Sequence, residues 1–484
     1  MSTDIRNIEP KTVWNHFADL NAVPRPSKKE ERVIQFMVDF GKSLNLETSV
    51  DKVGNVIIKK PATSGMEKRK KIVMQGHIDM VHQKNADTVF DFDSQGIQMF
   101  VEGDWVKAKG TTLGADNGLG VASIMAVLSS TDIPHPAIEG LFTIDEETGM
   151  TGAMGLEGNV LEGEILLNLD TEEDDEIGIG CAGGVDITAT GSYKEEITRE
   201  DDIAYQVSVK GLNGGHSGMD IIKGLGNANK IMNRLLYSVI NAIEIAEING
   251  GSLRNAIPRE SFATIVTDRN NDRFVELRLL EEIKKIKGEF KNLEPNLEIE
   301  FSTTSTPKQK MNKENSAILI KAIYATLNGV YRMSPDVDGL VETSNNVARV
   351  IVKEGQIKIG CLTRSSSESN KWDLANAIKS AFELANYSVE FSGEYPGWLP
   401  NMNSSILKTV ESTYIKLFNE QPNVAACHAG LECGILGQNY PDMEMISFGP
   451  NIKGAHSPDE KAQISSTQKF WKLLKEVLKN IPEK

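Results

Sequence analysis

KIVMQGHID, at residues 71–79, is the stretch that decides the fold. Its first five residues form a short apolar run typical of a buried strand, and residues 138–144 and 165–169 have the same character. Between the first two runs, residues 117–128 carry apolar side chains at helical spacing. Apolar strands that alternate with an amphipathic helix predict an α/β fold, with a mixed, largely parallel sheet flanked by helices.

The same pattern returns near the C-terminus. MEMISF at residues 443–448 is a further apolar strand. A long amphipathic helix is expected directly after it, with Ser457 as its N-cap, Pro458 in its first position and Glu460 completing a capping box. We therefore expect one catalytic domain built from both ends of the chain, residues 1–186 and 393–484.

The middle of the chain, residues 187–392, has a different pattern. It contains strand-like runs at 203–209 and 261–267, with a helix expected at about 225–243 between them. A second strand–helix succession of similar size follows, with a hairpin that turns at Glu354-Gly355. This succession predicts an inserted α+β domain made of two similar halves.

Length and charge limit the classes of partner. A chain of 484 residues is expected to form more than one domain. Its 52 Lys and Arg residues against 68 Asp and Glu residues give a net charge of −16, which repels nucleic acid and anionic membranes. The N-terminal residues MSTDIRNIEPKTVW lack the apolar core of a secretory signal, and the chain has only four cysteines. We expect a cytoplasmic protein that acts on a small molecule and binds neither nucleic acid nor membrane.

Each predicted strand of the first domain is followed by side chains that bind metal ions or transfer protons. They are His77 and Asp79 after the first strand, Asp145, Glu146 and Glu147 after the second, Asp170 after the third and His456 after the C-terminal one. Because the carboxyl ends of parallel strands meet at one crevice, we expect these side chains to lie together. Imidazole nitrogens and carboxylate oxygens are the ligands of catalytic zinc sites.

Two metal ions that lie close together need a bridging carboxylate. Asp116, in the glycine-rich segment GTTLGADNGLG at residues 110–120, is the candidate. It precedes a predicted helix, and the glycines on both sides allow a close approach of the backbone.

Each of these features has a structural explanation when taken alone. An H-x-D pair is often a surface pair, an acidic triplet is often a solvated turn, and Asp170 opens the acidic run DTEEDDE. A glycosidase would need two carboxylates that flank a sugar bond, which the adjacent Glu146 and Glu147 do not provide. The recurrence of such residues at successive strand ends favours a metal site.

The motifs as a set resemble those of the aminoacyl-histidine dipeptidases, or peptidase D. These enzymes belong to the co-catalytic zinc peptidases, which include peptidase T, carboxypeptidase G and aminoacylase. GADNG and HAGLECG (428–434) favour the dipeptidase branch. The matching motifs are GHIDMVHQK (76–84), GTTLGADNGLGVA (110–122), DEETGM (145–150), NLDTEE (168–173), GGHSGMD (214–220) and GPNIKGAHSPDE (449–460).

The resemblance implies two Zn²⁺ ions per chain, with Co²⁺ or Mn²⁺ as alternatives. His77 and Asp170 would bind one ion, Glu147 and His456 the other, and Asp116 would bridge them. The resemblance also implies a cis peptide bond after Asp116.

Further roles follow from the same resemblance. Asp79 would orient the ring of His77, and Glu146 would be the general base that activates water. His216, in the loop GLNGGHSG of the inserted domain, would donate a hydrogen bond to the substrate carbonyl, so that this domain is expected to close as a lid.

Substrate contacts are also implied by the resemblance. Asn255 and Arg364 would hold the substrate carboxylate, and Glu432 of HAGLECG would shape the pocket floor. A structural role stays open for Glu432, as does a simple polar-loop role for His216.

We therefore expect a zinc-dependent dipeptidase, an exopeptidase that hydrolyses dipeptides, including Xaa-His dipeptides such as β-Ala-His. The alternatives are a tripeptide aminopeptidase or an N-acyl amino acid amidohydrolase of the same family. A non-catalytic binding protein is disfavoured, because binding alone needs no base such as Glu146. The sequence leaves open whether the protein is a homodimer, and whether His216 serves its own chain or a neighbouring one.

Overall fold

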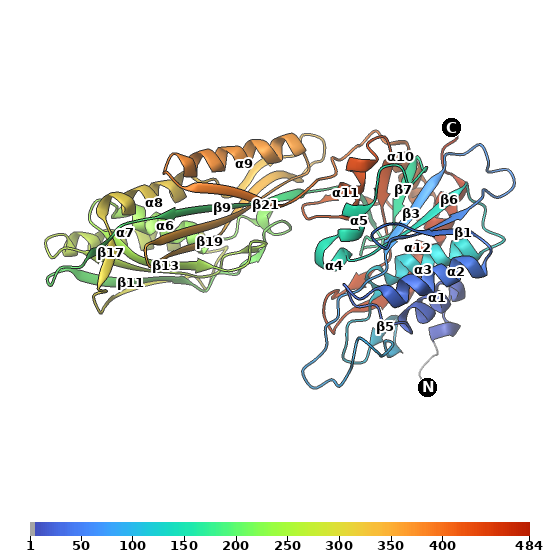
Figure 1. Ribbon diagram of the computed structural model, residues 1–484, viewed down its shortest axis with the longest axis horizontal. Helices are drawn as coiled ribbons and strands as arrows, with labels where there is room; N and C mark the ends of the chain where they lie inside the picture. Colours follow the sequence, from blue (N-terminus) through green and yellow to red (C-terminus); the bar gives the residue numbers. More distant parts are fainter. Residues whose placement is uncertain (1–4) are drawn as a thin grey trace. The chain divides into compact units, whose positions relative to one another are not determined.

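The chain forms two compact units in the computed structural model, which describes residues 5–484. The first unit contains the chain up to Gly180, together with Pro400–Ala426 and Leu431–Lys484. The second contains Cys181–Leu399 and Cys427–Gly430. In Figure 1 the blue, cyan and red parts of the chain form the first unit, and the green to orange part forms the second. The N-terminal segment MSTDIRNIEPKTVW was predicted to lack a secretory signal, and its residues 1–4 lie outside the described part.

The described residues of the first unit contain an eight-stranded mixed sheet. Its central strands β6, β3, β7 and β23 run parallel, which confirms the predicted largely parallel sheet. Strands β3, β6 and β7 are buried along their whole length, as expected for parallel strands covered on both faces. In spatial order the strands are β1 (Glu47–Val50), β2 (Val56–Lys60), β6 (Ile138–Thr143), β3 (Ile72–His77), β7 (Ile165–Asn168), β23 (Glu444–Ser447), β8 (Glu176–Cys181) and β22 (Asn423–Cys427).

The helices of the first unit cover this sheet. Helix α3 packs against both β3 and α1, so nearly all of its side chains are buried. Helix α12 buries one apolar face, which includes Phe470, Leu474 and Val477. The helices are η1 (Ile5–Asn7), α1 (Lys11–Asn21), α2 (Glu31–Ser43), α3 (Ala115–Ser129), α4 (Glu146–Gly149), α5 (Thr151–Gly155), α10 (Ser405–Phe418), α11 (Glu432–Asn439) and α12 (Ile464–Lys479).

The start predicted for the C-terminal helix is wrong. Helix α12 begins at Ile464 and not after Ser457. The intervening residues form strand β25 (Lys461–Gln463), which pairs with β24 (Ile452–Lys453) and with β5 (Trp105–Ala108), itself paired with β4 (Met99–Glu102). Glu460 is not part of a capping box, because its carboxylate accepts hydrogen bonds from main-chain amides between Leu113 and Asp116.

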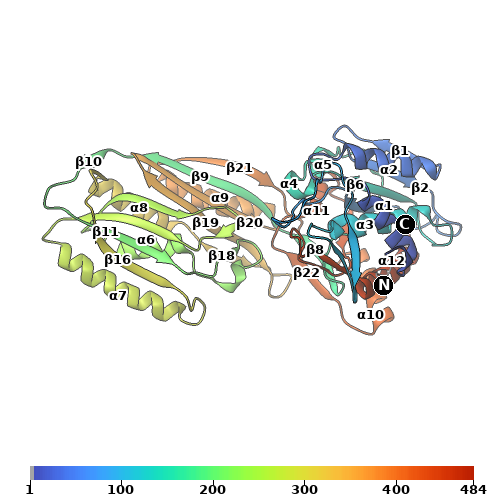
Figure 2. The ribbon, with the colours of Figure 1, turned by 90° about the horizontal axis from the view of Figure 1, so that it is seen from below.

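The described residues of the second unit form a nine-stranded antiparallel sheet. Figure 2 shows its long strands β19, β20, β9 and β21 beside one another. The hairpin β19–β20 turns at Glu354 and Gly355, both with positive φ, as predicted. The strands are β16 (Glu298–Thr304), β11 (Ile203–Lys210), β15 (Ser261–Thr267), β13 (Glu244–Gly251), β19 (Val341–Lys353), β20 (Gln356–Ser365), β9 (Gly183–Ser192) and β21 (Ser388–Tyr395), with β18 (Gly329–Met333) beside β19.

The helices of the second unit form one layer. Helix α6 (Ala228–Ser238) contacts both α7 (Asp272–Phe290) and α8 (Lys313–Ala325), and α8 contacts α9 (Glu368–Glu383). Apart from short strands, the chain passes through α6, β13, β15, α7 and β16, and then through α8, β19, β20, α9 and β21. A helix, two strands, a helix and a strand therefore follow one another twice in this unit. A single apolar core lies between the helices and the sheet.

The borders of the second unit differ from the predicted ones. Residues 187 and 392 fall inside β9 and β21, which continue to the observed borders near Cys181 and Leu399. Short elements of this unit include β10 (Glu195–Ile197), β17 (Gln309–Met311), β12 (Gly215–His216), β14 (Ala256–Ile257) and η2 (Ile221–Lys223).

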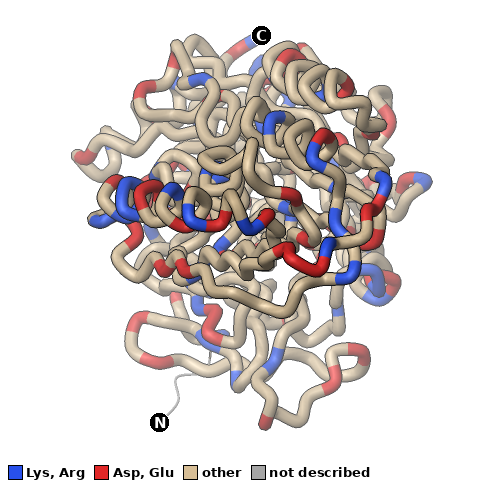
Figure 3. The backbone as a smooth tube through the Cα atoms, turned by 90° about the vertical axis from the view of Figure 1, so that its left-hand side faces the viewer, with Lys and Arg blue, Asp and Glu red and all other residues tan. Residues whose placement is uncertain are grey.

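Charged residues of both signs occur throughout the described chain. In Figure 3 acidic and basic residues are interspersed along the coloured part of the chain, and this view shows no continuous basic stripe. None of the helices described for residues 5–484 has the length and apolar character needed to cross a membrane.

Candidate metal centre

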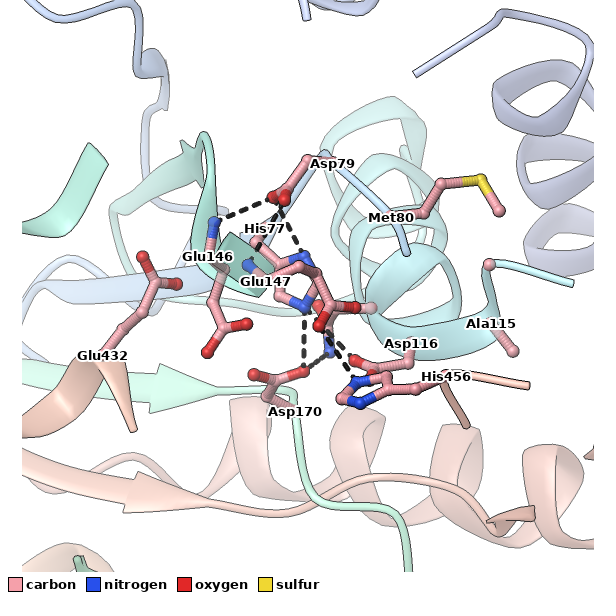
Figure 4. A network of polar contacts seen from close by, with 12 residues as sticks. His77, Asp79, Met80, Ala115, Asp116, Glu146, Glu147, Asp170, Glu432 and His456 are labelled. Carbon is pink, nitrogen blue, oxygen red and sulfur yellow. Dashed lines mark hydrogen bonds and ion pairs between the residues drawn. The ribbon is translucent and has the colours of Figure 1, made fainter. Parts of the chain in front are cut away.

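The ends of the central parallel strands bring the predicted residues together in the first unit (Figure 4). His77 is the last residue of β3, and Asp170 follows β7. Glu146 and Glu147 open helix α4, which follows β6. His456 lies in the loop after β24. Strands β6, β3 and β7 are neighbours in the sheet, so their carboxyl ends meet at one edge. Strand β24, which precedes His456, belongs to the separate four-stranded sheet with β25, β5 and β4.

One group of ligand atoms comes from His77, Asp116 and Asp170. These atoms all lie within 4.8 Å of one another. His77 Nε2 is 3.2 Å from Asp116 Oδ1 and 3.7 Å from Asp170 Oδ1. The set combines one imidazole with two carboxylates, a donor set that suits a catalytic zinc ion.

A second group comes from Asp116, Glu147 and His456, again within 4.8 Å of one another. His456 Nε2 is 3.2 Å from Asp116 Oδ2 and 2.9 Å from Glu147 Oε2. Asp116 therefore presents one oxygen to each group, which is the arrangement expected of a bridging ligand. The residues present fit a pair of metal ions.

The electrostatics of the site favour positive charge. Hydrogen bonds that His456 donates to the carboxylates of Asp116 and Glu147 raise its pKa to about 11. Burial raises the pKa of Asp170 well above its usual range, and the neighbouring carboxylates of Asp116 and Glu146 add to this effect. The cluster contains four carboxylates, Asp116, Glu146, Glu147 and Asp170, and only two histidines, His77 and His456.

Asp79 organises the surroundings of His77. Its Oδ1 atom is 3.3 Å from Nδ1 of His77, which leaves Nε2 facing Asp116 and Asp170. The same carboxylate accepts hydrogen bonds from the main-chain amides of Glu146 (3.1 Å) and Glu147 (3.3 Å). Burial opposes ionisation of Asp79, but its contacts with His77, the Ser27 hydroxyl and the Glu146 amide together outweigh burial and lower its pKa. Asp79 thus links the β3 end to the start of α4.

Glu146 has the properties of a proton-transfer group. One of its carboxylate oxygens lies within 4.8 Å of ligand atoms of His77 and Glu147. Burial raises the pKa of Glu146 to about 8; the charge of His77 opposes this shift, and the carboxylates of Glu432 and Glu147 reinforce it. A carboxyl group with such a pKa can both accept and release a proton near neutral pH.

Glycines allow the segment around Asp116 to pack against β3 and β7. A Cβ atom on Gly76 would lie 2.3 Å from Oδ1 of Asn117, and one on Gly120 would lie 2.4 Å from the carbonyl oxygen of Leu169. The Asn117 side chain donates a 2.6 Å hydrogen bond to that carbonyl and a further one to Asp170. The peptide bond between Asp116 and Asn117 is cis, as the resemblance implied.

His216 lies on the short strand β12 of the second unit. Its Nδ1 atom accepts hydrogen bonds from the main-chain amides of Gly218 (3.2 Å) and Met219 (3.1 Å). Burial lowers the pKa of His216, and the charge of Arg364 adds to this shift. The ring is therefore neutral at pH 7 and carries its proton on Nε2, which makes it a hydrogen-bond donor.

The other predicted residues of the second unit gather around the same turn. Arg364, near the end of β20, donates to the Tyr395 hydroxyl at 2.6 Å and lies 3.5 Å from Ser217 Oγ. Asn255 is exposed, and its main-chain carbonyl oxygen accepts a 2.7 Å hydrogen bond from the main-chain amide of Ser217. Arg364 and Asn255 thus lie close to the residue that follows His216.

His428 also belongs to this cluster, although no role in it had been predicted from the sequence. His428 is buried, and its Nε2 atom lies 2.8 Å from the Ser344 hydroxyl. Burial lowers its pKa to about 3, and the charges of Arg364 and His216 contribute. Its position in HAGLECG was the available signal, but sequence spacing does not show that this segment packs within the second unit.

Glu432 opens α11 in the first unit and is 1% exposed. Its Oε2 atom accepts hydrogen bonds from Gln75 (2.6 Å) on β3 and Thr143 (2.7 Å) on β6. Figure 4 shows Glu432 on the Glu146 side of the cluster. These contacts give Glu432 a structural role, because it joins β3, which ends in His77, to β6, which precedes Glu146. Gln75 and Thr143 were not singled out in the sequence, since buried polar residues within an apolar run have no distinctive pattern.

The chain is similar along most of its length to known peptidases. The model of Peptidase family M20/M25/M40 matches residues 73–480. The chain is 43% identical over 484 residues to the cytosol non-specific dipeptidase of Escherichia coli (strain K12), covering all of both chains.

Solved structures of peptidases also resemble this chain. The chain superposes on the crystal structure of aminoacylhistidine dipeptidase from Vibrio alginolyticus with a TM-score of 0.96 and 43% identity, covering 100% of this chain and 99% of that one. Aminopeptidase PepT from Bacillus cereus shares the fold, with a TM-score of 0.58, 15% identity and coverage of 98% and 99%. The chain belongs to the peptidase family M20/M25/M40.

Proposed function

We propose that the protein is a metal-dependent dipeptidase whose substrates include Xaa-His dipeptides such as β-Ala-His. The observation that carries this proposal is the pair of imidazole–carboxylate groups that share Asp116, with the carboxyl of Glu146 beside them. The names of the two 43% identical relatives, a non-specific dipeptidase and an aminoacylhistidine dipeptidase, support dipeptides as the substrate class.

The proposed metal ions are two Zn²⁺, with Co²⁺ or Mn²⁺ as substitutes, since all three accept these nitrogen and oxygen ligands. His77 and Asp170 would hold one ion, Glu147 and His456 the other, and Asp116 both. Bound there, the ions would supply Lewis acidity and lower the pKa of a water molecule.

Protein groups would handle the proton. Glu146 would take the proton of the attacking water and pass it to the departing amine, and a pKa of about 8 suits both steps. Asp79 would keep the His77 ring oriented with Nε2 toward the ligand cluster.

The second unit would supply substrate contacts. The neutral His216, with its proton on Nε2, is suited to donate a hydrogen bond to the carbonyl oxygen as negative charge develops there. Arg364 and Asn255 would bind the free carboxylate of the dipeptide, and Glu432 would support the pocket floor.

We further propose that the protein works in the cytoplasm on small peptides. Its 43% identical Escherichia coli relative carries the word cytosol in its name. The net charge of −16 disfavours nucleic acid as a partner.

A substrate panel with metal analysis tests the proposal. The purified protein would be assayed with β-Ala-His, Gly-His, other dipeptides, tripeptides and N-acyl amino acids, and its metal content would be measured. We expect turnover of dipeptides, loss of activity with a chelator and recovery on addition of zinc. Turnover confined to tripeptides or to N-acyl amino acids would replace the dipeptidase proposal with the corresponding alternative.

A mixing experiment decides which chain His216 serves. The variants His216→Ala and Glu146→Gln would each be inactive, and they would be mixed under conditions that allow subunits to exchange. Recovery of activity in the mixture indicates a homodimer in which His216 completes a neighbouring site. A mixture that stays inactive, although exchange is verified with differently tagged chains, assigns His216 to its own chain.

A further inference from the structure

A buried carboxylate lies behind the bridging residue of the metal centre. Glu460 is only 2% exposed. Its Oε2 atom accepts hydrogen bonds from the amides of Leu113 (2.7 Å) and Gly114 (2.9 Å). Its Oε1 atom accepts from those of Ala115 (2.7 Å) and Asp116 (3.3 Å). One side chain thus fixes the backbone of the whole segment that ends in Asp116.

These amides belong to the start of helix α3, which lacks a cap of its own. The residue in the N-cap position is Gly114, which has a φ of 69° and no side chain that could accept a hydrogen bond. Glu460 satisfies these amides from a distant part of the sequence, and its negative charge is favourable at a helix N-terminus. Charge-assisted hydrogen bonds of this kind are stronger than neutral ones.

Arg25 is the buried counter-charge on the same segment, at 1% exposure. Its guanidinium donates to the Gly114 carbonyl at 2.5 Å. It also donates to the carbonyls of Ile78 (3.1 Å) and Asp79 (2.9 Å), which directly follow His77. Arg25 therefore joins the loop of the bridging aspartate to the loop after β3.

The loop that carries Glu460 also carries His456. It is a tight turn in which Gly454 and His456 both have positive φ. The Ser457 amide donates to the Gly454 carbonyl (3.2 Å), and the Glu460 amide donates to the Ser457 carbonyl (3.0 Å). Because this turn is closed by its own hydrogen bonds, anchoring Glu460 also anchors His456.

We infer that Glu460, with Arg25 as its counter-charge, is a positioning residue that holds the loops of Asp116 and His456 at the separation needed for two metal ions. His456 Nε2 lies 3.2 Å from Asp116 Oδ2, and Glu460 is the side chain that ties their two main-chain segments together. This inference rests on the metal centre of the proposed function. It goes beyond that proposal because Glu460 is not itself a ligand.

Metal affinity, measured without activity, tests the inference. Glu460→Gln and Glu460→Ala would be compared with the wild-type protein by competition with a chromophoric zinc chelator and by metal content after dialysis. Glutamine keeps the shape but turns an NH₂ group toward two amides that need an acceptor. We expect the affinity for zinc to fall about 10–100-fold in Glu460→Gln, the range found when residues that support ligands are changed. Glu460→Ala should retain fewer ions per chain after dialysis, with the ion at His456 and Glu147 lost first.

Glu139→Gln is the matched control. Glu139 is also a buried carboxylate of the first unit, 5% exposed, and it accepts hydrogen bonds from the amides of Glu162 (2.8 Å) and Gly163 (2.9 Å). It lies outside the metal centre, so the variant should bind zinc as the wild type does even if its stability is lower. Glu460→Asp, which keeps the charge, should bind zinc more tightly than Glu460→Ala.

The outcomes separate the inference from the proposed function. Unchanged zinc affinity in a folded Glu460→Gln protein would overturn the inference, as would an equal loss in Glu139→Gln, which would indicate general destabilisation. Circular dichroism would verify folding, and Glu460→Asp provides the comparison if Glu460→Ala does not fold. A wild-type protein that binds no metal would instead refute the proposed function itself.

Discussion

The two units of the molecule carry polar clusters of opposite character. The cluster of the first unit is rich in carboxylates, and burial raises the pKa of Glu146 there to about 8. The cluster of the second unit combines Arg364 with His216 and His428, and burial lowers the pKa of His428 to about 3. The same physical cause, loss of hydration, therefore acts on opposite charges. The first cluster is suited to cations, and the second offers hydrogen-bond donors.

The clusters also differ in how the chain builds them. In the first unit His77, the Glu146–Glu147 pair and Asp170 follow neighbouring parallel strands, so their position is tied to a repeating pattern. In the second unit they come from β12, β20 and a four-residue segment, Cys427–Gly430, whose sequence neighbours belong to the other unit. Variants in each cluster test whether the first cluster governs zinc binding and proton transfer and the second contributes to kcat alone.

The largest effect is expected from Glu146→Gln in the first cluster. Removing the proton acceptor should lower kcat by about 10²–10⁴-fold, because general acid–base catalysis contributes that much. Zinc content should stay at the wild-type value, since Glu146 is not a proposed ligand. Steady-state kinetics on β-Ala-His and metal analysis measure the two quantities. Glu157→Gln, an exposed glutamate paired with Lys52, is the control. An unchanged kcat in Glu146→Gln would remove the proposed mechanism.

His216→Ala should have the next largest effect and would test the second cluster. Loss of a hydrogen-bond donor to developing negative charge lowers kcat by about 10²–10³-fold. Zinc affinity should not change, because His216 belongs to the second unit and not to the metal centre. His82→Ala, which removes an exposed histidine of the first unit, should leave kcat unaltered. If His216→Ala behaved like His82→Ala, the second unit would have no catalytic part.

Asp79→Asn should affect the first cluster more mildly. Asparagine has one acceptor oxygen in place of two, so it cannot accept from the His77 ring and from both the Glu146 and Glu147 amides. We expect zinc affinity to fall by about 10–100-fold. Chelator competition provides the measurement. Asp51→Asn removes a similar carboxylate, which accepts amide hydrogen bonds outside the metal centre, and it should leave the affinity unchanged.

Near neutral pH, the smallest effect is expected from the titration of His428. Its folded pKa of about 3 lies below the ordinary value of 6.5, so between these values the unfolded chain binds the proton more readily. The contribution of His428 to the free energy of unfolding should therefore be fully present above pH 6.5. It should decrease as the pH falls toward 3, with a slope that approaches about 1.4 kcal/mol per pH unit.

Denaturant unfolding of the wild type and of His428→Gln at several pH values measures this contribution. His428 faces Arg364, His216 and the Ser344 hydroxyl, and none of these neighbours supplies a negative charge that would stabilise its protonated form. Equal slopes in the two proteins over this range would show that His428 does not titrate as inferred.

The pattern of the sequence alone predicted the parallel sheet of the first unit and the candidate ligands at its edge. Short apolar runs followed by His77, Glu147, Asp170 and His456 predicted a parallel sheet with ligands at its carboxyl edge, because strand direction fixes where such residues must meet. The hairpin at Glu354-Gly355 was equally predictable, since its turn chemistry is local.

Only the tertiary structure decided which distant residues support the site. Glu460 appeared to cap its own helix, yet its carboxylate binds amides more than 300 residues earlier in the chain. His428 and Glu432 are only four positions apart but belong to different units. Long-range hydrogen bonds of buried polar groups depend on how the helices and strands pack together. Sequence periodicity indicates local secondary structure and does not indicate which distant elements pack together.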